Sequence, residues 1–314
     1  MDIATQTVHR LRTAINDLAW SLWSELGVSS WTPSRHASWG IELEPLIVLT
    51  GSLPEIDVRR RNEVIDWCVS NDRFISLAQL RRSIAHLHGG QRPAELSTFT
   101  ATVSQLGRRR WPLAADGEGL HITLSGKSAP PQLASPALYQ LRLRAIFGVS
   151  ARAEILRVLS REPHELTVTQ IADRAATRSG RWLWTPRCSP AAASSTGRGA
   201  PAPPGTRSVD PSSLAAFVGE RPAFFPRWTE PFTTLFHLMG AFQKVAAAEL
   251  NAPDVELWRW LRRADECTAG LRIPQDLWRR PSLEGLAAWG VVAADHLATG
   301  DAAAYERGLG ASGP

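Results

Sequence analysis

Apolar side chains recur every three to four residues along most of the chain, which is the spacing of amphipathic helices. A compact apolar segment at 41–53 does not follow this spacing. The chain is therefore expected to be mainly α. Helices are expected at 3–26, 58–67 behind a capping Asp57, 77–87 behind Ser76, 99–106, 136–147, 150–161, 167–175, 232–250, 257–269 and 283–297.

The segment 141–180 alternates short helices with tight breaks. Its first full helix is expected to start at Ser150 as the N-cap and to end before Pro163. A second helix is expected to start at Thr167, which stands three residues before Gln170 in the capping-box arrangement. The turn at 175–177 would then lead into a basic third helix. The apolar stripe of this segment comprises Ile146, Val149, Ala153, Leu156 and Leu159.

This outline resembles the winged-helix transcriptional regulators of the arsenical-repressor and multiple-antibiotic-resistance-regulator type. The resemblance covers the central segment, about 141–210, and rests on Leu166-Thr167-Val168 followed by Gln170-Ile171-Ala172-Asp173-Arg174-Ala175. Ala176 stands where these regulators usually have glycine. The resemblance implies a helix-turn-helix that binds double-stranded DNA, with its third helix in the major groove. The implied DNA-binding residues are Thr167, Thr169, Gln170, Thr177, Arg178, Ser179 and Arg181.

The sequence after this segment does not have the pattern of the expected recognition helix and β-hairpin wing. Residues 180–206 are instead rich in Pro, Ala, Ser and Gly, a composition typical of disordered segments. A second interpretation is a frameshift over about 180–208. Trp182-Leu183-Trp184-Thr185, encoded TGG CTN TGG ACN, read from the third base gives Ala, then Val, Leu or Met, then Asp, which suits a helix. The nucleotide sequence across codons 175–212 distinguishes an insert from an out-of-frame stretch.

Composition narrows the class of protein. The chain has 314 residues, 44% of them hydrophobic and 21% charged, as in soluble globular proteins. A formal net charge of +5 favours an anionic partner. Cys68, Cys188 and Cys267 lie far apart, so neither a zinc site nor a disulfide framework is expected, and a reducing cytoplasm is the expected location. No apolar run of about 18 residues occurs, so no membrane partner is expected.

Motifs of catalysis are missing from the sequence, including the Walker loop, G-x-S-x-G, H-E-x-x-H and G-x-G-x-x-G. Residues 147–152 are similar to the Gly-Ser start of minimal nucleotidyltransferases, but no Asp-x-Asp pair for magnesium follows. We therefore expect no catalytic residue, no metal, no cofactor and no enzymatic activity. Tryptophans at helical positions are expected to serve core packing, namely Trp20, Trp23, Trp67, Trp258, Trp260 and Trp289.

These observations predict four regions: an N-terminal helical domain (1–110), a linker (111–135), a winged-helix domain (136–218) and a C-terminal helical domain (219–314). The last domain is expected to form a homodimer or to sense a partner. The leading hypothesis is a bacterial DNA-binding transcriptional regulator. The alternative is a winged-helix scaffold for protein interaction, of antitoxin-like type, with no DNA target, because fold does not fix function.

Overall fold

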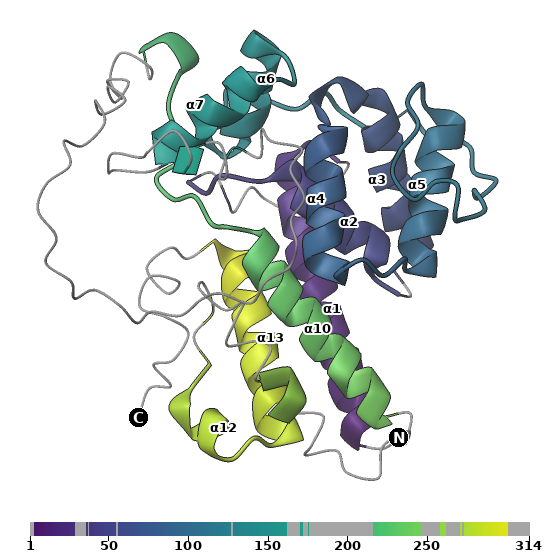
Figure 1. Cartoon of the computed structure of the whole chain (residues 1–314), viewed down its shortest axis with the longest axis vertical. Helices are drawn as coiled ribbons and strands as arrows, with labels where there is room; N and C mark the ends of the chain where they lie inside the picture. Colours follow the sequence, from purple (N-terminus) through teal and green to yellow (C-terminus); the bar gives the residue numbers. More distant parts are fainter. Residues whose placement is uncertain are drawn as a thin grey trace, which may run out of the picture.

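The protein is mainly helical, as the hydrophobic pattern predicts (Figure 1). A computed structural model describes residues 3–28, 36, 38–54, 56–126, 128–161, 170–171, 175, 216–246, 258–261, 271 and 273–300. The elements with defined bounds are α1 (Ile3–Glu25), α2 (Leu43–Ser52), α3 (Val58–Ser70), η1 (Asp72–Phe74), α4 (Leu77–His88), α5 (Ala94–Leu106), η2 (Pro136–Leu138), α6 (Tyr139–Phe147), α7 (Ala151–Arg161), α10 (Thr229–Ala246), α12 (Gln275–Arg279) and α13 (Leu283–Thr299).

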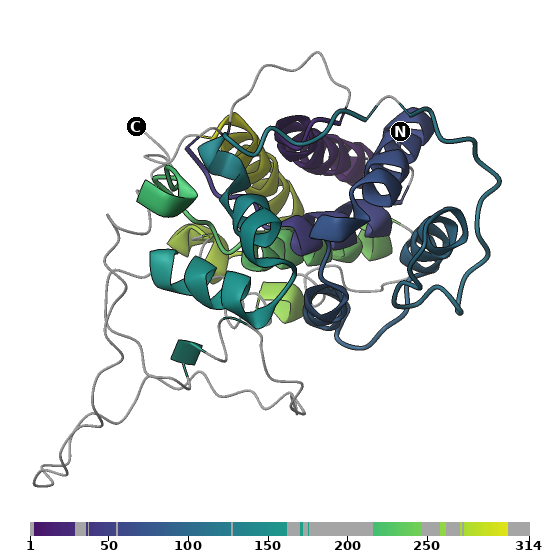
Figure 2. The same ribbon diagram turned by 90° about the horizontal axis from the view of Figure 1, so that it is seen from above.

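Three long helices from opposite ends of the chain, α1, α10 and α13, lie side by side (Figures 1 and 2). Their apolar faces join the α2–α5 region in one hydrophobic core, which extends from Val8 to Ala298. Gly290 of α13 allows close packing, because a Cβ there would lie 3.0 Å from a methyl carbon of Leu11. The N-terminal and C-terminal helical regions therefore share a core in space.

Helix α2 occupies the apolar segment for which the sequence spacing predicted no amphipathic helix. All ten of its residues are buried, and it contacts α1, α4, α5 and α10. A helix that is covered on every side needs apolar residues on every side, which removes the period of 3.6 residues. The missing periodicity thus reflects complete burial.

The predicted N-terminal caps at Asp57 and Ser76 are confirmed. The Asp57 carboxylate accepts a hydrogen bond from the backbone N–H of Arg60, and the Ser76 hydroxyl accepts one from that of Gln79. Each bond satisfies a first-turn N–H that has no partner inside its helix. Helix α4 ends at Gly89, whose φ of 57° lies in the left-handed region that glycine adopts without strain.

The described residues of the expected linker, 111–126 and 128–135, are irregular and lie against the helices. Ser125 donates a hydrogen bond to the Asp66 carboxylate of α3 at 2.6 Å, and the Leu120 N–H donates to Thr102 of α5 at 2.9 Å. Residues 121–126 form no strand, although Ile122, Thr123 and Leu124 favour one by composition. Among the described residues, β-type pairing is limited to one isolated bridge between Trp39 and Phe224.

Tryptophans pack mainly in the core. Trp23 and Trp67 are fully buried with ring centroids 5.5 Å apart, and Trp260 and Trp289 are also buried. Trp258 differs, because 38% of its surface is exposed. The expectation of core packing is therefore confirmed for four of the six side chains and wrong for Trp258. The sixth, Trp20, is partly buried and packs against the core.

His88 makes the stability of the fold sensitive to pH. Its Nε2 lies 2.8 Å from the Ser52 hydroxyl, which donates its own proton to the Val48 carbonyl. Burial, with a smaller contribution from His237, lowers the pKa of His88 from 6.5 to about 4. Between these values the unfolded chain binds the proton and the folded chain does not, so stability decreases as the pH falls.

We expect the free energy of unfolding to decrease by about 1–2 kcal/mol between pH 7 and pH 5 through His88. Urea denaturation at both pH values measures this change. The variant His88→Gln keeps a donor toward Ser52 but does not titrate, so its unfolding free energy should change less. An equal pH dependence in both proteins would assign the effect to other groups.

Candidate nucleic-acid interface

Helices α6 and α7 form a hairpin at the start of the expected helix-turn-helix. Helix α7 begins one residue after Ser150, as predicted, but the Ser150 hydroxyl donates to the Phe147 carbonyl at 3.0 Å. Ile146 and Val149, two members of the predicted apolar stripe, are exposed. They lie at the end of α6 and in the turn, where the direction of the chain changes and the helical spacing no longer places them on the inner face of α7.

The second predicted helix contacts α7 through the residues that the structure describes. Residues 170 and 171 are helical, and the Ala175 N–H donates to the Ile171 carbonyl at 2.8 Å. Ile171 and Ala175 are buried in a small cluster with Val158 of α7. This packing is what the first two helices of a helix-turn-helix require.

Among the predicted DNA-binding residues, the structure describes Gln170, which is exposed. The remaining ones, Thr167, Thr169, Thr177, Arg178, Ser179 and Arg181, lie outside the described residues, as do the predicted wing and the segment 180–208.

Helix α4 supports the end of this second helix. The side-chain amide of Gln79 donates to the Ala175 carbonyl at 3.0 Å. Ala175 lies next to the expected turn before the third helix, so the position of α4 affects the chain at the point where the recognition helix should begin.

A buried ionic cluster fixes α6 and α7 to the rest of the protein. The Arg144 side chain is fully buried, and its guanidinium donates to both carboxylate oxygens of Glu44 in α2, at 2.6 and 3.1 Å. It also donates to Glu154 of α7, at 2.6 Å, and to the Phe74 carbonyl, at 2.7 Å. One side chain thus connects α2, η1, α6 and α7.

Electrostatic attraction outweighs desolvation in this cluster. Burial disfavours the charged form of Arg144, but the carboxylates of Glu44 and Glu154 outweigh burial and raise its pKa. Burial likewise opposes ionisation of Glu154, whereas Arg144 and Arg157 lower its pKa overall. Arg144 and Glu154 are therefore charged at neutral pH.

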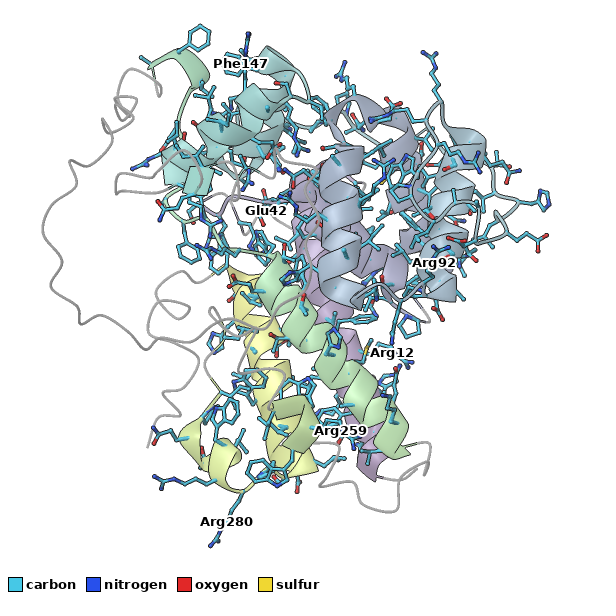
Figure 3. All side chains as sticks on the ribbon, viewed as in Figure 1. Arg12, Glu42, Arg92, Phe147, Arg259 and Arg280 are labelled. Atoms are coloured by element: carbon cyan, nitrogen blue, oxygen red, sulfur yellow. The ribbon has the colours of Figure 1, made fainter. Side chains whose placement is uncertain are left out.

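Arg157 extends the cluster toward the surface. It donates to Glu154 at 3.0 Å and to Glu42 at 2.7 Å, and Arg161 approaches Glu42 at 3.8 Å. Glu42 lies between α7, α4 and the start of α10 (Figure 3). The ion pairs hold the inner face of α7 in one orientation on the helical body.

Arg142 also connects distant segments of the chain, on the other side of α6. Its guanidinium donates to the carbonyls of Leu133, Ala134 and Ser135 and to those of Val218 and Glu220, at 2.6–3.2 Å. It joins the segment before α6 to the chain that leads into α10.

None of these charged residues was expected from the sequence to form a cluster. A signal was present, because Glu42 and Glu44 interrupt an otherwise largely apolar segment. Glu154 and Arg157 flank buried positions of α7 at helical spacing. Charged residues are rarely buried unless they are paired. Pairs separated by a hundred residues, however, have no signature in one sequence.

Comparisons of the chain with protein-family models, with curated proteins and with solved structures find no match. Among the described residues, no three His, Cys, Asp or Glu side chains are grouped so that they could hold a metal ion. None of the described helices combines the length and apolar character needed to cross a bilayer.

Proposed function

We propose that this protein is a DNA-binding transcriptional regulator that uses a helix-turn-helix. The observation that supports the proposal is the packing of Ile171 and Ala175 against Val158, because the second helix of that motif packs on the first through small apolar side chains. The ionic cluster supports it, because Arg144 and Arg157 anchor the supporting helix α7 to a rigid body. A recognition helix needs such a scaffold in order to enter the major groove in a fixed orientation.

In the proposed mode of binding, the third helix enters the major groove with Arg178 and Arg181 near base edges or phosphates. Exposed Gln170, together with Thr167 and Thr169, would contact the DNA backbone. Contacts of this kind release counterions from the duplex, so binding should weaken strongly as the salt concentration rises.

We expect Arg178→Ala with Arg181→Ala to lower the affinity for duplex DNA by about 100-fold at low salt, because each arginine contact contributes about 1–3 kcal/mol. A gel shift on fragments selected from a random duplex library measures the loss. The matched control is Arg279→Ala with Arg280→Ala, two exposed arginines at and just beyond the end of α12 that change the net charge equally. An equal loss in both variants would indicate nonspecific charge attraction.

Because of the predicted frameshift, the DNA-binding experiment needs a second protein. The gel shift is therefore run with the chain as it stands and with a variant in which 180–208 is restored to the alternative reading frame. Because position 181 lies in that stretch, the double arginine variant is made in the chain as it stands, and Arg178→Ala alone is made in the restored chain. Duplex binding by either protein supports the proposal. If neither binds at low salt, the regulator function is wrong and the protein-interaction scaffold becomes the better explanation.

A further inference from the structure

A cavity of about 250 Å³ lies between residues 42–45, α4, α7 and the start of α10. Figure 3 shows Glu42 at the meeting point of these elements. The cavity thus adjoins both the ionic cluster and the supporting helix of the helix-turn-helix, although no site was expected here from the sequence.

Arginine side chains dominate the charge around the cavity. Arg82, Arg157, Arg161 and Arg227 line it, against the carboxylates of Glu42, Glu44 and Glu230. Both oxygens of Glu44 are held by Arg144, which does not line the cavity. Burial raises the pKa of Glu230, although Arg227 opposes this effect. The Glu230 carboxyl group therefore accepts a proton more readily when another anion approaches.

Two buried side chains have donor atoms that the protein does not use. Gln140 is 6% exposed and accepts a hydrogen bond from the Leu43 N–H through Oε1, but within the described part of the chain its Nε2 has no acceptor. Arg157 is 9% exposed and donates through Nε and Nη1, whereas its Nη2 has no acceptor there. Both residues line the cavity and neither donor atom is fully enclosed, so both can donate to the oxygen of a ligand.

We propose that this cavity binds a small organic oxyanion, a metabolite with a carboxylate or phosphate group. The planar guanidinium groups supply paired N–H donors that match such oxygens. The amide of Gln140 supplies a further N–H, and the N-terminus of the 18-residue helix α10 adds a favourable dipole. A volume slightly below the 300 Å³ at which drug-sized sites begin limits the ligand to a small metabolite.

The cavity is connected to the helix-turn-helix by two of its lining residues. Gln79 donates to the Ala175 carbonyl, and Val158 packs against Ile171. A bound oxyanion would therefore bias the position of the second helix. Binding of the anion is independent of the DNA-binding proposal, whereas its regulatory consequence rests on that proposal.

The test measures the melting temperature Tm of the full chain with inorganic phosphate or succinate, each against sodium chloride at equal ionic strength. A specific site should give a saturable rise of about 4 °C at a probe concentration 100-fold above Kd. A rise with one probe alone supports the site and identifies the group that it binds. The absence of a saturable rise with either probe overturns the proposal.

Arg82→Gln should abolish the rise, whereas Arg81→Gln, the exposed neighbour outside the cavity lining, should keep it. Arg227→Gln provides a second cavity variant if Arg82→Gln does not fold. An equal rise in the cavity variants and in Arg81→Gln would place the anion elsewhere and overturn the site. Gel shifts with and without the probe are a separate experiment. If the chain binds the anion but no DNA, the anion site is supported and only the regulator function is wrong.

Discussion

Replacing Arg144 by methionine is expected to lower the free energy of unfolding by about 3–5 kcal/mol, as measured by urea denaturation at pH 7. Methionine fills much of the same volume but leaves the buried carboxylate of Glu44 without its cation and Glu154 with Arg157 alone. An uncompensated buried charge is far more costly than the loss of a surface pair, because little water is present to solvate it.

The pH dependence distinguishes a charge effect from a packing effect. In the variant, the Glu154 carboxyl group loses Arg144, the main cause that lowers its pKa, and should bind a proton more readily. The deficit of the variant relative to the wild type should therefore shrink between pH 7 and pH 5. The control is Arg59→Met, which breaks the exposed Arg59–Glu63 pair and should cost less than about 1 kcal/mol. A deficit that is the same at both pH values would attribute the loss to packing.

The hydrophobic pattern predicted individual helices well because each amphipathic helix carries its period within itself. Local side-chain chemistry also predicted the caps at Asp57 and Ser76, since a cap and its N–H lie three residues apart. The hydrophobic pattern predicted no helix at 43–52. Because α2 is completely buried, it lacks the periodic change between apolar and polar residues that marks an amphipathic helix.

Contacts between distant segments could not be predicted in this way. One sequence does not show that α1 packs against α13, or that Arg144 pairs with Glu44, because nothing local selects one apolar face or one carboxylate among many. The cavity depends on such contacts, since its lining comes from residues 42–45, α4, α6, α7 and the start of α10. The proposed recognition helix, in contrast, is inferred from the sequence alone, including Arg178 and Arg181.

Trp228 provides the sharpest test of whether the two ends of the chain unfold together. Its side chain is fully buried, its Nε1 donates to the Gly40 carbonyl at 2.7 Å, and its ring packs against Trp39 at 5.8 Å between centroids. The backbone reinforces the contact, because the Gly40 N–H donates to the Phe224 carbonyl at 2.8 Å. We expect Trp228→Ala to lower the free energy of unfolding by about 4 kcal/mol, through lost burial and a cavity.

The matched control is Trp258→Ala, which removes an equally large but exposed ring and should cost about 1 kcal/mol or less. Calorimetry of the wild type should show a single transition for residues on both sides of the Trp228 contact, because α1, α10 and α13 share one core. Two resolved transitions, with Trp228→Ala shifting only the one that involves α10 and α13, would contradict a shared core. The N-terminal and C-terminal helical regions would then be separate folding units, as the sequence division at 110 and 219 suggests.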